Sequence, residues 1–130
     1  NRDFLKISSS MDLFLKCWII LIAVQHFFFF IMESFLWKSL GRKIFGKGRN
    51  IDFFNDTASL AFNQGVYNLF LCAGLFLSLI LREDQCASTL RNFFLICIVT
   101  AGIAGGWSVS RRIFIVQAIP ALIALIIGII

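Results

Sequence analysis

The sequence predicts an all-α integral membrane protein, folded as a compact, antiparallel, up-down bundle of four transmembrane helices. Two observations support this fold class. The first is composition: of 130 residues, 59% are hydrophobic and only 15% are charged, whereas soluble domains carry about 25% charged residues. A soluble chain this small could not bury so much apolar surface. The second is distribution, because the apolar residues gather in four runs, each close to the length of about 20 residues that crosses a bilayer.

The first predicted span covers residues 17–37. It is too long and too aromatic for a signal peptide, and no small-residue cleavage site follows it. The residues before Met11 differ in character from the rest, and Met11 would serve as a start. We therefore expect 1–10 to be a leader or a segment foreign to the natural chain, and 11–130 to be a single four-helix membrane domain.

The remaining spans follow a basic segment that contains three glycines and should hold no long helix. They are predicted at 59–81, 90–108 and 113–130. Arg111 and Arg112 mark a tight turn, and links this short force neighbouring helices to run in opposite directions. Pro120 lacks a backbone donor and should kink the last helix near Val116 and Gln117.

The third span carries a surface for close helix packing. Gly102 and Gly106 form a GxxxG pattern, and Ala101 with Gly105 forms a second pair of small residues. Such surfaces let backbones approach each other in membranes. Within one bundle this pattern favours packing inside the chain, and a homodimer remains the alternative.

The basic residues predict an orientation. Seven belong to the face that carries the first loop and the last turn: Lys38, Arg42, Lys43, Lys47, Arg49, Arg111 and Arg112. Five belong to the opposite face: Arg2, Lys6, Lys16, Arg82 and Arg91. Because Lys and Arg are retained on the cytoplasmic side, we expect both termini outside and the basic loop in the cytoplasm. This clustering explains the net charge of +5 without nucleic-acid binding, for which no motif is present.

Polar residues inside the spans indicate where a function would reside, since ionisable groups there are costly. At the helical rise, Glu33 lies about 6 Å inside the basic face and His26 about 16 Å inside, on one helical stripe. On the second span, Asn63 and Gln64 should match the depth of Glu33. Tyr67 and Asn68 should approach that of His26, and Gln117 lies about 6 Å below the basic face.

Three helices thus bring polar side chains to matching depths in one leaflet. The carboxylate of Glu33 needs a partner, for which the candidates are Gln117, Asn63 and Arg111. The predicted pocket opens to the basic face and is lined by His26, Glu33, Asn63, Gln64, Tyr67, Asn68 and Gln117. The alternative is that these side chains only link helices, since interhelical hydrogen bonds in membranes average about 0.6 kcal/mol.

The usual catalytic and metal-binding motifs are absent from the sequence. It contains no Walker loop, GxSxG or HExxH, and His26 with Glu33 is too small a set for a metal. We therefore expect no cofactor. Cys17 and Cys86 should fall at one membrane face, which leaves a disulfide between them open.

Three stretches resemble one family of small membrane proteins. They are Glu33-x-Phe35-Leu36-Trp37 with Gly41-Arg42-Lys43-x-Phe45-Gly46; Ala61-x-Asn63-Gln64-Gly65-x-Tyr67-Asn68-x-Phe70-Leu71; and Val109-Ser110-Arg111-Arg112-Ile113-x-x-x-Gln117-x-x-Pro120-Ala121. The family is domain of unknown function 1304, a group of short, mostly bacterial, four-helix membrane proteins. The resemblance runs from about Leu15 to the end, and His26 and Glu33 look like the histidine and glutamate of the family's first span. It implies the fold and a bacterial inner membrane, and it adds no mechanism.

These observations favour a small polytopic membrane protein that binds or transports a small or lipid-like molecule in the cytoplasmic leaflet. Its partners would be membrane lipids and that ligand. One alternative is a membrane-embedded enzyme with His26 and Glu33 as an acid/base pair, although the sequence favours a role without catalysis. Another is a structural or accessory membrane subunit.

Overall fold

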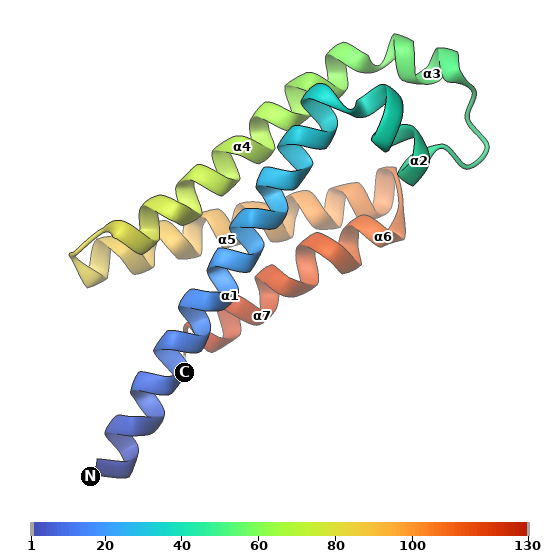
Figure 1. The fold of residues 1–130 in the computed structure, drawn as a ribbon. Coiled ribbons are helices and arrows are strands. Elements are labelled where there is room, and N and C mark those ends of the chain that lie inside the picture. Colours follow the sequence, from blue (N-terminus) through green and yellow to red (C-terminus); the bar gives the residue numbers. More distant parts are fainter. Residues whose placement is uncertain (1, 130) are drawn as a thin grey trace. The chain divides into compact units, whose positions relative to one another are not determined.

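The structure, a computed structural model, describes residues 2–129, with side chains from Ser10 onward (Figure 1). Every regular element in this range is a helix. Three stretches are long and apolar enough to cross a membrane, judged by length and composition: Ser10–Phe35, Ala58–Ile80 and Asp84–Ser108. The all-helical, membrane-type fold is therefore confirmed. The fourth predicted span is helical but divided into shorter elements, so the four-helix bundle stays a prediction.

The chain forms two compact units. One is Val24–Cys72, and the other combines the residues up to Ala23 with those from Ala73 onward. Helix α1 (Arg2–Phe35) and helix α4 (Ala58–Ile80) each contribute to both units. The helix α1 includes residues 2–9, so the segment expected to be foreign to the natural chain continues directly into the first apolar helix.

The Val24–Cys72 unit contains a folded connection between α1 and α4, residues 36–57, where the sequence predicted a loop. The connection comprises the π-helix η1 (Trp37–Gly41) and two short helices, α2 (Arg42–Phe45) and α3 (Ile51–Asp56). The α-helical pattern gives way because the Gly41 N–H donates to the carbonyl of Leu36, five residues back, at 3.0 Å. Gly48 then turns the chain with a φ of 80°, a conformation that costs glycine little.

Local hydrogen bonds and aromatic packing hold this connection together. The Asn50 side chain accepts from the N–H of Phe53 at 3.0 Å and begins α3, as a preferred N-cap residue does. The Trp37 indole N–H donates to the Thr57 hydroxyl at 3.0 Å. Its ring centroid lies 6.0 Å from that of Phe45 and 5.3 Å from that of Phe54, which is fully buried. The ends of α1 and α4 are therefore joined by an ordered segment.

In the other unit, α5 (Asp84–Ser108) begins earlier than the predicted start at Leu90. Its first turns are polar, and the hydroxyls of Ser88 and Thr89 donate back to the carbonyl of Gln85 at 3.1 and 2.8 Å. A pattern of apolar residues detects the part of a helix that crosses lipid, and it misses polar turns that precede it.

The last helical run comprises α6 (Arg111–Ile113), the π-helix η2 (Phe114–Ala118) and α7 (Ile119–Ile127). The turn before it lies at Val109 and Ser110, so the predicted turn at Arg111 and Arg112 was misplaced by two residues. Ser110 begins the helix because its hydroxyl accepts from the N–H of Arg112 at 3.3 Å. The irregularity expected from Pro120 takes the form of η2, just before the proline.

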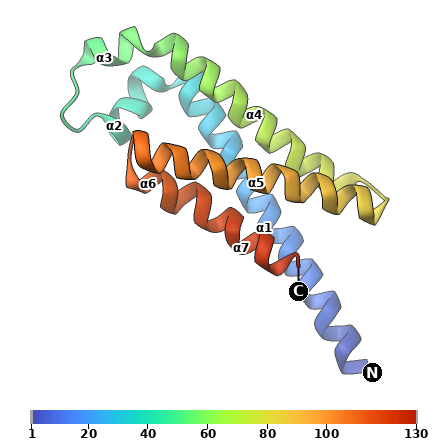
Figure 2. The ribbon, with the colours of Figure 1, turned by 180° about the vertical axis from the view of Figure 1, so that it is seen from behind.

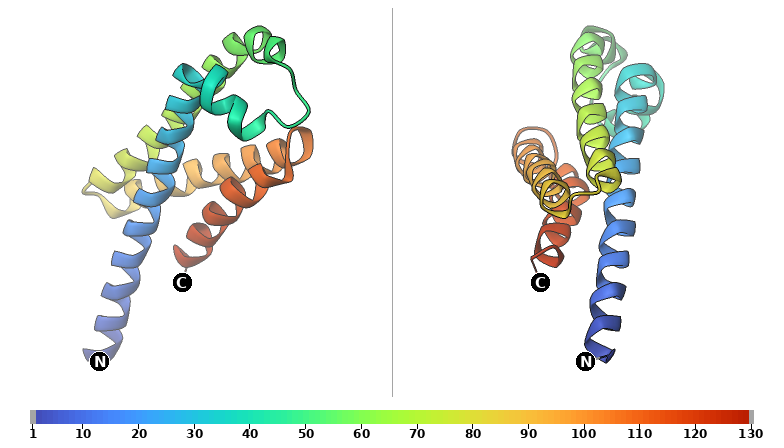
Figure 3. Two further views of the ribbon diagram at one scale, coloured as in Figure 1. Left: turned by 45° about the vertical axis from the view of Figure 1, so that its right-hand side comes forward. Right: turned by 90° about the vertical axis from the view of Figure 1, so that its left-hand side faces the viewer.

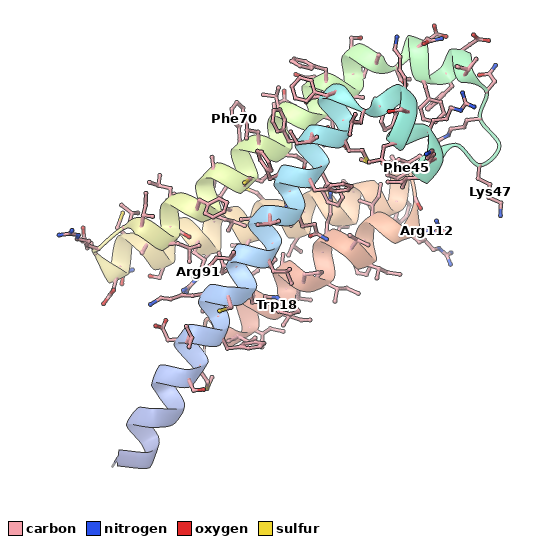
Figure 4. All side chains as sticks on the ribbon, viewed as in Figure 1. Trp18, Phe45, Lys47, Phe70, Arg91 and Arg112 are labelled. Atoms are coloured by element: carbon pink, nitrogen blue, oxygen red, sulfur yellow. The ribbon has the colours of Figure 1, made fainter. Side chains whose placement is uncertain are left out.

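Glycines set the packing of α5 against this run, which lies beside it in Figures 2 and 3. A Cβ on Gly102 would stand 2.7 Å from the backbone nitrogen of Ala118. One on Gly105 would meet Ile113 at 2.7 Å, and one on Gly106 would meet Phe114 at 2.6 Å. The small-residue surface is therefore used within the chain. In the same unit the Trp18 indole donates to the carbonyl of Pro120 at 3.0 Å (Figure 4).

The four cysteines are free thiols. Cys17 and Cys86 are both exposed and do not form the disulfide that the sequence left open.

Candidate functional site

The centre of the site is a hydrogen bond between two helices of membrane-spanning length. The Asn68 side-chain nitrogen donates to the Glu33 carboxylate at 2.7 Å, and also to the backbone carbonyl of Gln64 at 3.3 Å. Asn68 is 3% exposed and Glu33 is half-buried. At 2.7 Å this is a short hydrogen bond for an amide donor, and it links α1 to α4 at this level.

A close backbone approach one turn away sets the alignment of the two helices. A Cβ on Gly65 would overlap the Ser34 hydroxyl and stand 3.1 Å from the carbonyl oxygen of Phe30. Only glycine permits this separation without a shift. With Ser34 beside Gly65, the next pair along the helices is Glu33 and Asn68.

This alignment corrects the sequence prediction for the partner of Glu33. Gln117 and Arg111 belong to the other unit, and Asn63 is exposed. Asn63 and Asn68 are five residues apart, which on a helix of 3.6 residues per turn separates them by about 140°. The prediction failed because depths were counted from the apolar ends of the spans, and the true alignment depends on Gly65 and on the folded connection.

The other predicted residues of α4 surround the pair unequally. Gln64 lies one turn from Asn68, is exposed, and forms the rim of the site. Tyr67 is 51% exposed and its ring lies 6.4 Å from that of Phe70. Gln64 therefore stands beside the site, whereas Tyr67 and Asn63 point away from the helix contact.

His26 lies on the same stripe of α1 as Glu33, two turns towards the N-terminus. It is 0% exposed, and its ring meets the edge of Phe29 at a centroid distance of 5.7 Å. Gln117 is half-buried within η2 of the other unit. Asn68 thus joins the Glu33 carboxyl group to the backbone carbonyl of Gln64. Asn63 and Tyr67 are exposed, His26 lies two turns away on α1, and Gln117 belongs to the other unit.

Ser34 is a residue of this site that the sequence prediction omitted. Its hydroxyl oxygen is buried and makes no hydrogen bond within the described residues. The sequence shows a small polar residue, Ser34, next to Glu33. Its place in the site became evident only from the structure, in which Gly65 lies opposite.

The chemistry of the site is that of a hydrogen-bond acceptor. Within the Val24–Cys72 unit, the second carboxylate oxygen of Glu33 and the amide oxygen of Asn68 receive no hydrogen bond. Within residues 2–129 no group of three or more His, Cys, Asp or Glu side chains could hold a metal ion. The arrangement suits a molecule that presents N–H or O–H groups.

Comparison with known protein families gives one match. The model of the family described as protein of unknown function (DUF1304) covers residues 20–129. The chain belongs to this family. The match includes all three stretches that suggested the resemblance, and with them Glu33, Gly65 and Asn68. Searches of curated proteins and of solved structures found no match.

Proposed function

We propose that this chain is a four-span membrane protein that binds, and in one form of the hypothesis transports, a small or lipid-like molecule at Glu33 and Asn68. Its polar head would donate hydrogen bonds to the open oxygens of the pair, and its apolar body would lie along the helices. The chain would sit in a bacterial inner membrane with both termini outside. The α1–α4 connection would then lie in the cytoplasm, and the site in the adjacent leaflet.

The observation that carries this proposal is the incompletely bonded carboxylate in a helix of spanning length. A charged group in lipid is costly and marks a functional site by default. A purely structural contact would be expected to satisfy both carboxylate oxygens, because partly satisfied buried networks lose more than they gain. Glu33 instead keeps one carboxylate oxygen without a hydrogen bond within its own unit.

A matched set of ten-carbon amphiphiles tests the proposal. The purified chain in mild detergent should gain thermal stability with decylamine, gain less with decanol, and gain nothing with decanoate, which offers no donor when ionised. Glu33→Gln should abolish the gain with decylamine, because the amide keeps a partner for Asn68 but loses the charge. Asn63→Ala, at an exposed amide on α4, serves as the control and should keep the gain.

Two results would overturn the proposal. One is equal stabilisation by the amine and the carboxylate. The other is stabilisation that survives Glu33→Gln.

A structural or accessory role is the second candidate, and the same hydrogen bond supports it. In that case Glu33→Gln and Asn68→Ala would lower the melting temperature without changing the effect of any amphiphile. The enzymatic alternative receives less support, since a fully buried His26 against Phe29 favours packing over proton transfer to a substrate.

A further inference from the structure

The connection between α1 and α4 carries a concentration of positive charge that its two acidic residues, Asp52 and Asp56, offset only in part. Between residues 38 and 49 there are five basic residues and no acidic one: Lys38, Arg42, Lys43, Lys47 and Arg49. All five are exposed, and none forms an ion pair with the residues described around it. Arg49 has a different contact, with its guanidinium carbon 4.6 Å from the ring centre of Phe53.

These charges stand on an ordered scaffold. Gly41 lies against the Trp37 indole so closely that a Cβ there would stand 2.6 Å from the ring. The indole in turn packs on Phe45 and Phe54 and is bonded to Thr57. Figure 4 shows Lys47 extending outward from the turn between α2 and α3.

Orientation alone does not account for this scaffold. Basic residues that determine topology act through their presence near a span and need no particular fold. Here the aromatic residues turn inward and the cations turn outward. Exposed aliphatic side chains stand among the cations: Leu36 at 39%, Ile44 at 42% and Ile51 at 51% exposure. Cations together with exposed aliphatic groups are typical of segments that lie in the headgroup region of a bilayer.

We infer that the α1–α4 connection is a docking surface for anionic phospholipid headgroups of the leaflet it adjoins. The charges are complementary, and clusters of four to eight Lys or Arg next to a transmembrane helix bind anionic lipids. The occupant is a lipid and not a free phosphate, because Leu36, Ile44 and Ile51 place apolar surface where acyl chains would lie. The inference is independent of the ligand proposed for Glu33.

Lipid quenching of Trp37 tests the inference at the scaffold itself. With Trp18→Phe and Trp107→Phe, Trp37 is the sole tryptophan of the full chain. In phosphatidylcholine vesicles, brominated phosphatidylglycerol should quench Trp37 more strongly than brominated phosphatidylcholine at equal mole fraction. Arg42→Gln with Lys43→Gln should weaken the apparent association by about 25-fold, from about fivefold per charge.

The matched control is Arg82→Gln with Arg91→Gln, two arginines that the sequence assigns to the opposite membrane face. It removes the same charge and should leave the preference of Trp37 intact. Equal quenching by the two brominated lipids would overturn the inference, as would equal losses in the two double variants.

A second measurement avoids the tryptophan substitutions. Native mass spectrometry of the otherwise unaltered chain should show more retained phosphatidylglycerol than phosphatidylcholine, and the excess should fall with Arg42→Gln and Lys43→Gln. An unchanged excess in that variant contradicts the inference.

Discussion

The two units of this chain bring helices together in different ways. In the Val24–Cys72 unit, α1 and α4 meet at the hydrogen bond between Asn68 and Glu33, at 2.7 Å, and the connection between them is held by the bond between Trp37 and Thr57, at 3.0 Å. In the other unit, α5 meets the run from α6 to α7 through Gly102, at a contact of small residues. Each contact includes a glycine at which an added Cβ would collide with the neighbouring helix. The two contacts differ in which atoms of the neighbouring helix lie next to that glycine.

That difference separates a contact that can adapt from one that cannot. At Gly65 the nearest atom is the hydroxyl of Ser34, a side chain that can rotate. At Gly102 it is the backbone nitrogen of Ala118, with the Ala118 Cβ at 2.8 Å. A backbone can yield only by moving a helix. The contact at Gly65 can therefore accommodate a small change by rotation of a side chain, whereas the contact at Gly102 cannot.

The largest expected effect is at the rigid contact. Gly102→Val should lower the free energy of unfolding by about 3 kcal/mol, because overpacking against backbone costs that order of energy. Unfolding in mixed micelles measures it. Ala104→Val is the matched control on an exposed position of the same helix, and a comparable loss there would show that α5 tolerates no added bulk anywhere.

The polar contact should respond less to loss of a partner. Asn68→Ala leaves the Glu33 carboxylate without the one hydrogen bond it has, and should cost about 2 kcal/mol, in the range for bonds to charged groups. The same unfolding assay applies, with Asn63→Ala as the control at an exposed amide. If both alanine variants cost the same, the hydrogen bond contributes nothing specific.

A double-mutant cycle examines whether the polar contact adapts. Gly65→Ala should cost about 1 kcal/mol or more through overlap with Ser34. Ser34→Ala removes the atom that the new methyl group meets first, so it should recover part of that loss, with a coupling of about 0.5 kcal/mol or more. Strict additivity of the two changes would mean that the backbone of Phe30, and not the Ser34 side chain, prevents a larger residue at position 65. The backbone of Ala118 has that role at Gly102.

The smallest expected effect is at the end of the same unit. Trp37→Phe keeps an aromatic ring between Phe45 and Phe54 and removes only the bond to Thr57. A loss of about 0.6 kcal/mol is expected, the average for interhelical bonds in membranes. Thr57→Val also removes the hydrogen bond that the Thr57 hydroxyl donates to the carbonyl of Phe53 at 2.6 Å, so it should cost more. The double variant should lose no more than Thr57→Val alone. If Trp37→Phe instead lowers the free energy of unfolding by as much as Asn68→Ala does, the hydrogen bond of Trp37 contributes as much to the unit as that of Asn68.

The sequence was sufficient for the all-helical, membrane-type fold and for the family, because both follow from apolar runs and specific residue patterns. It also singled out Glu33, because an ionisable residue inside an apolar run is recognisable from the sequence alone. It could not identify Asn68 as the partner. That choice depends on helix rotation and vertical alignment, and both follow from the Gly65 approach and from η1, where one extra residue enters a turn. The same limit explains why Ser34 was overlooked.

The π-helix η2 changes which residues share a face along the last helical run. Its wide turn takes in a residue without adding a full turn of rise, so the faces before and after it are out of phase by one position. A helical wheel continued through Phe114–Ala118 would assign lipid-facing and buried positions wrongly on one side of it. Comparisons across the family should therefore phase Arg111–Ile113 and Ile119–Ile127 as separate segments. A relative one residue shorter there could keep both faces unchanged.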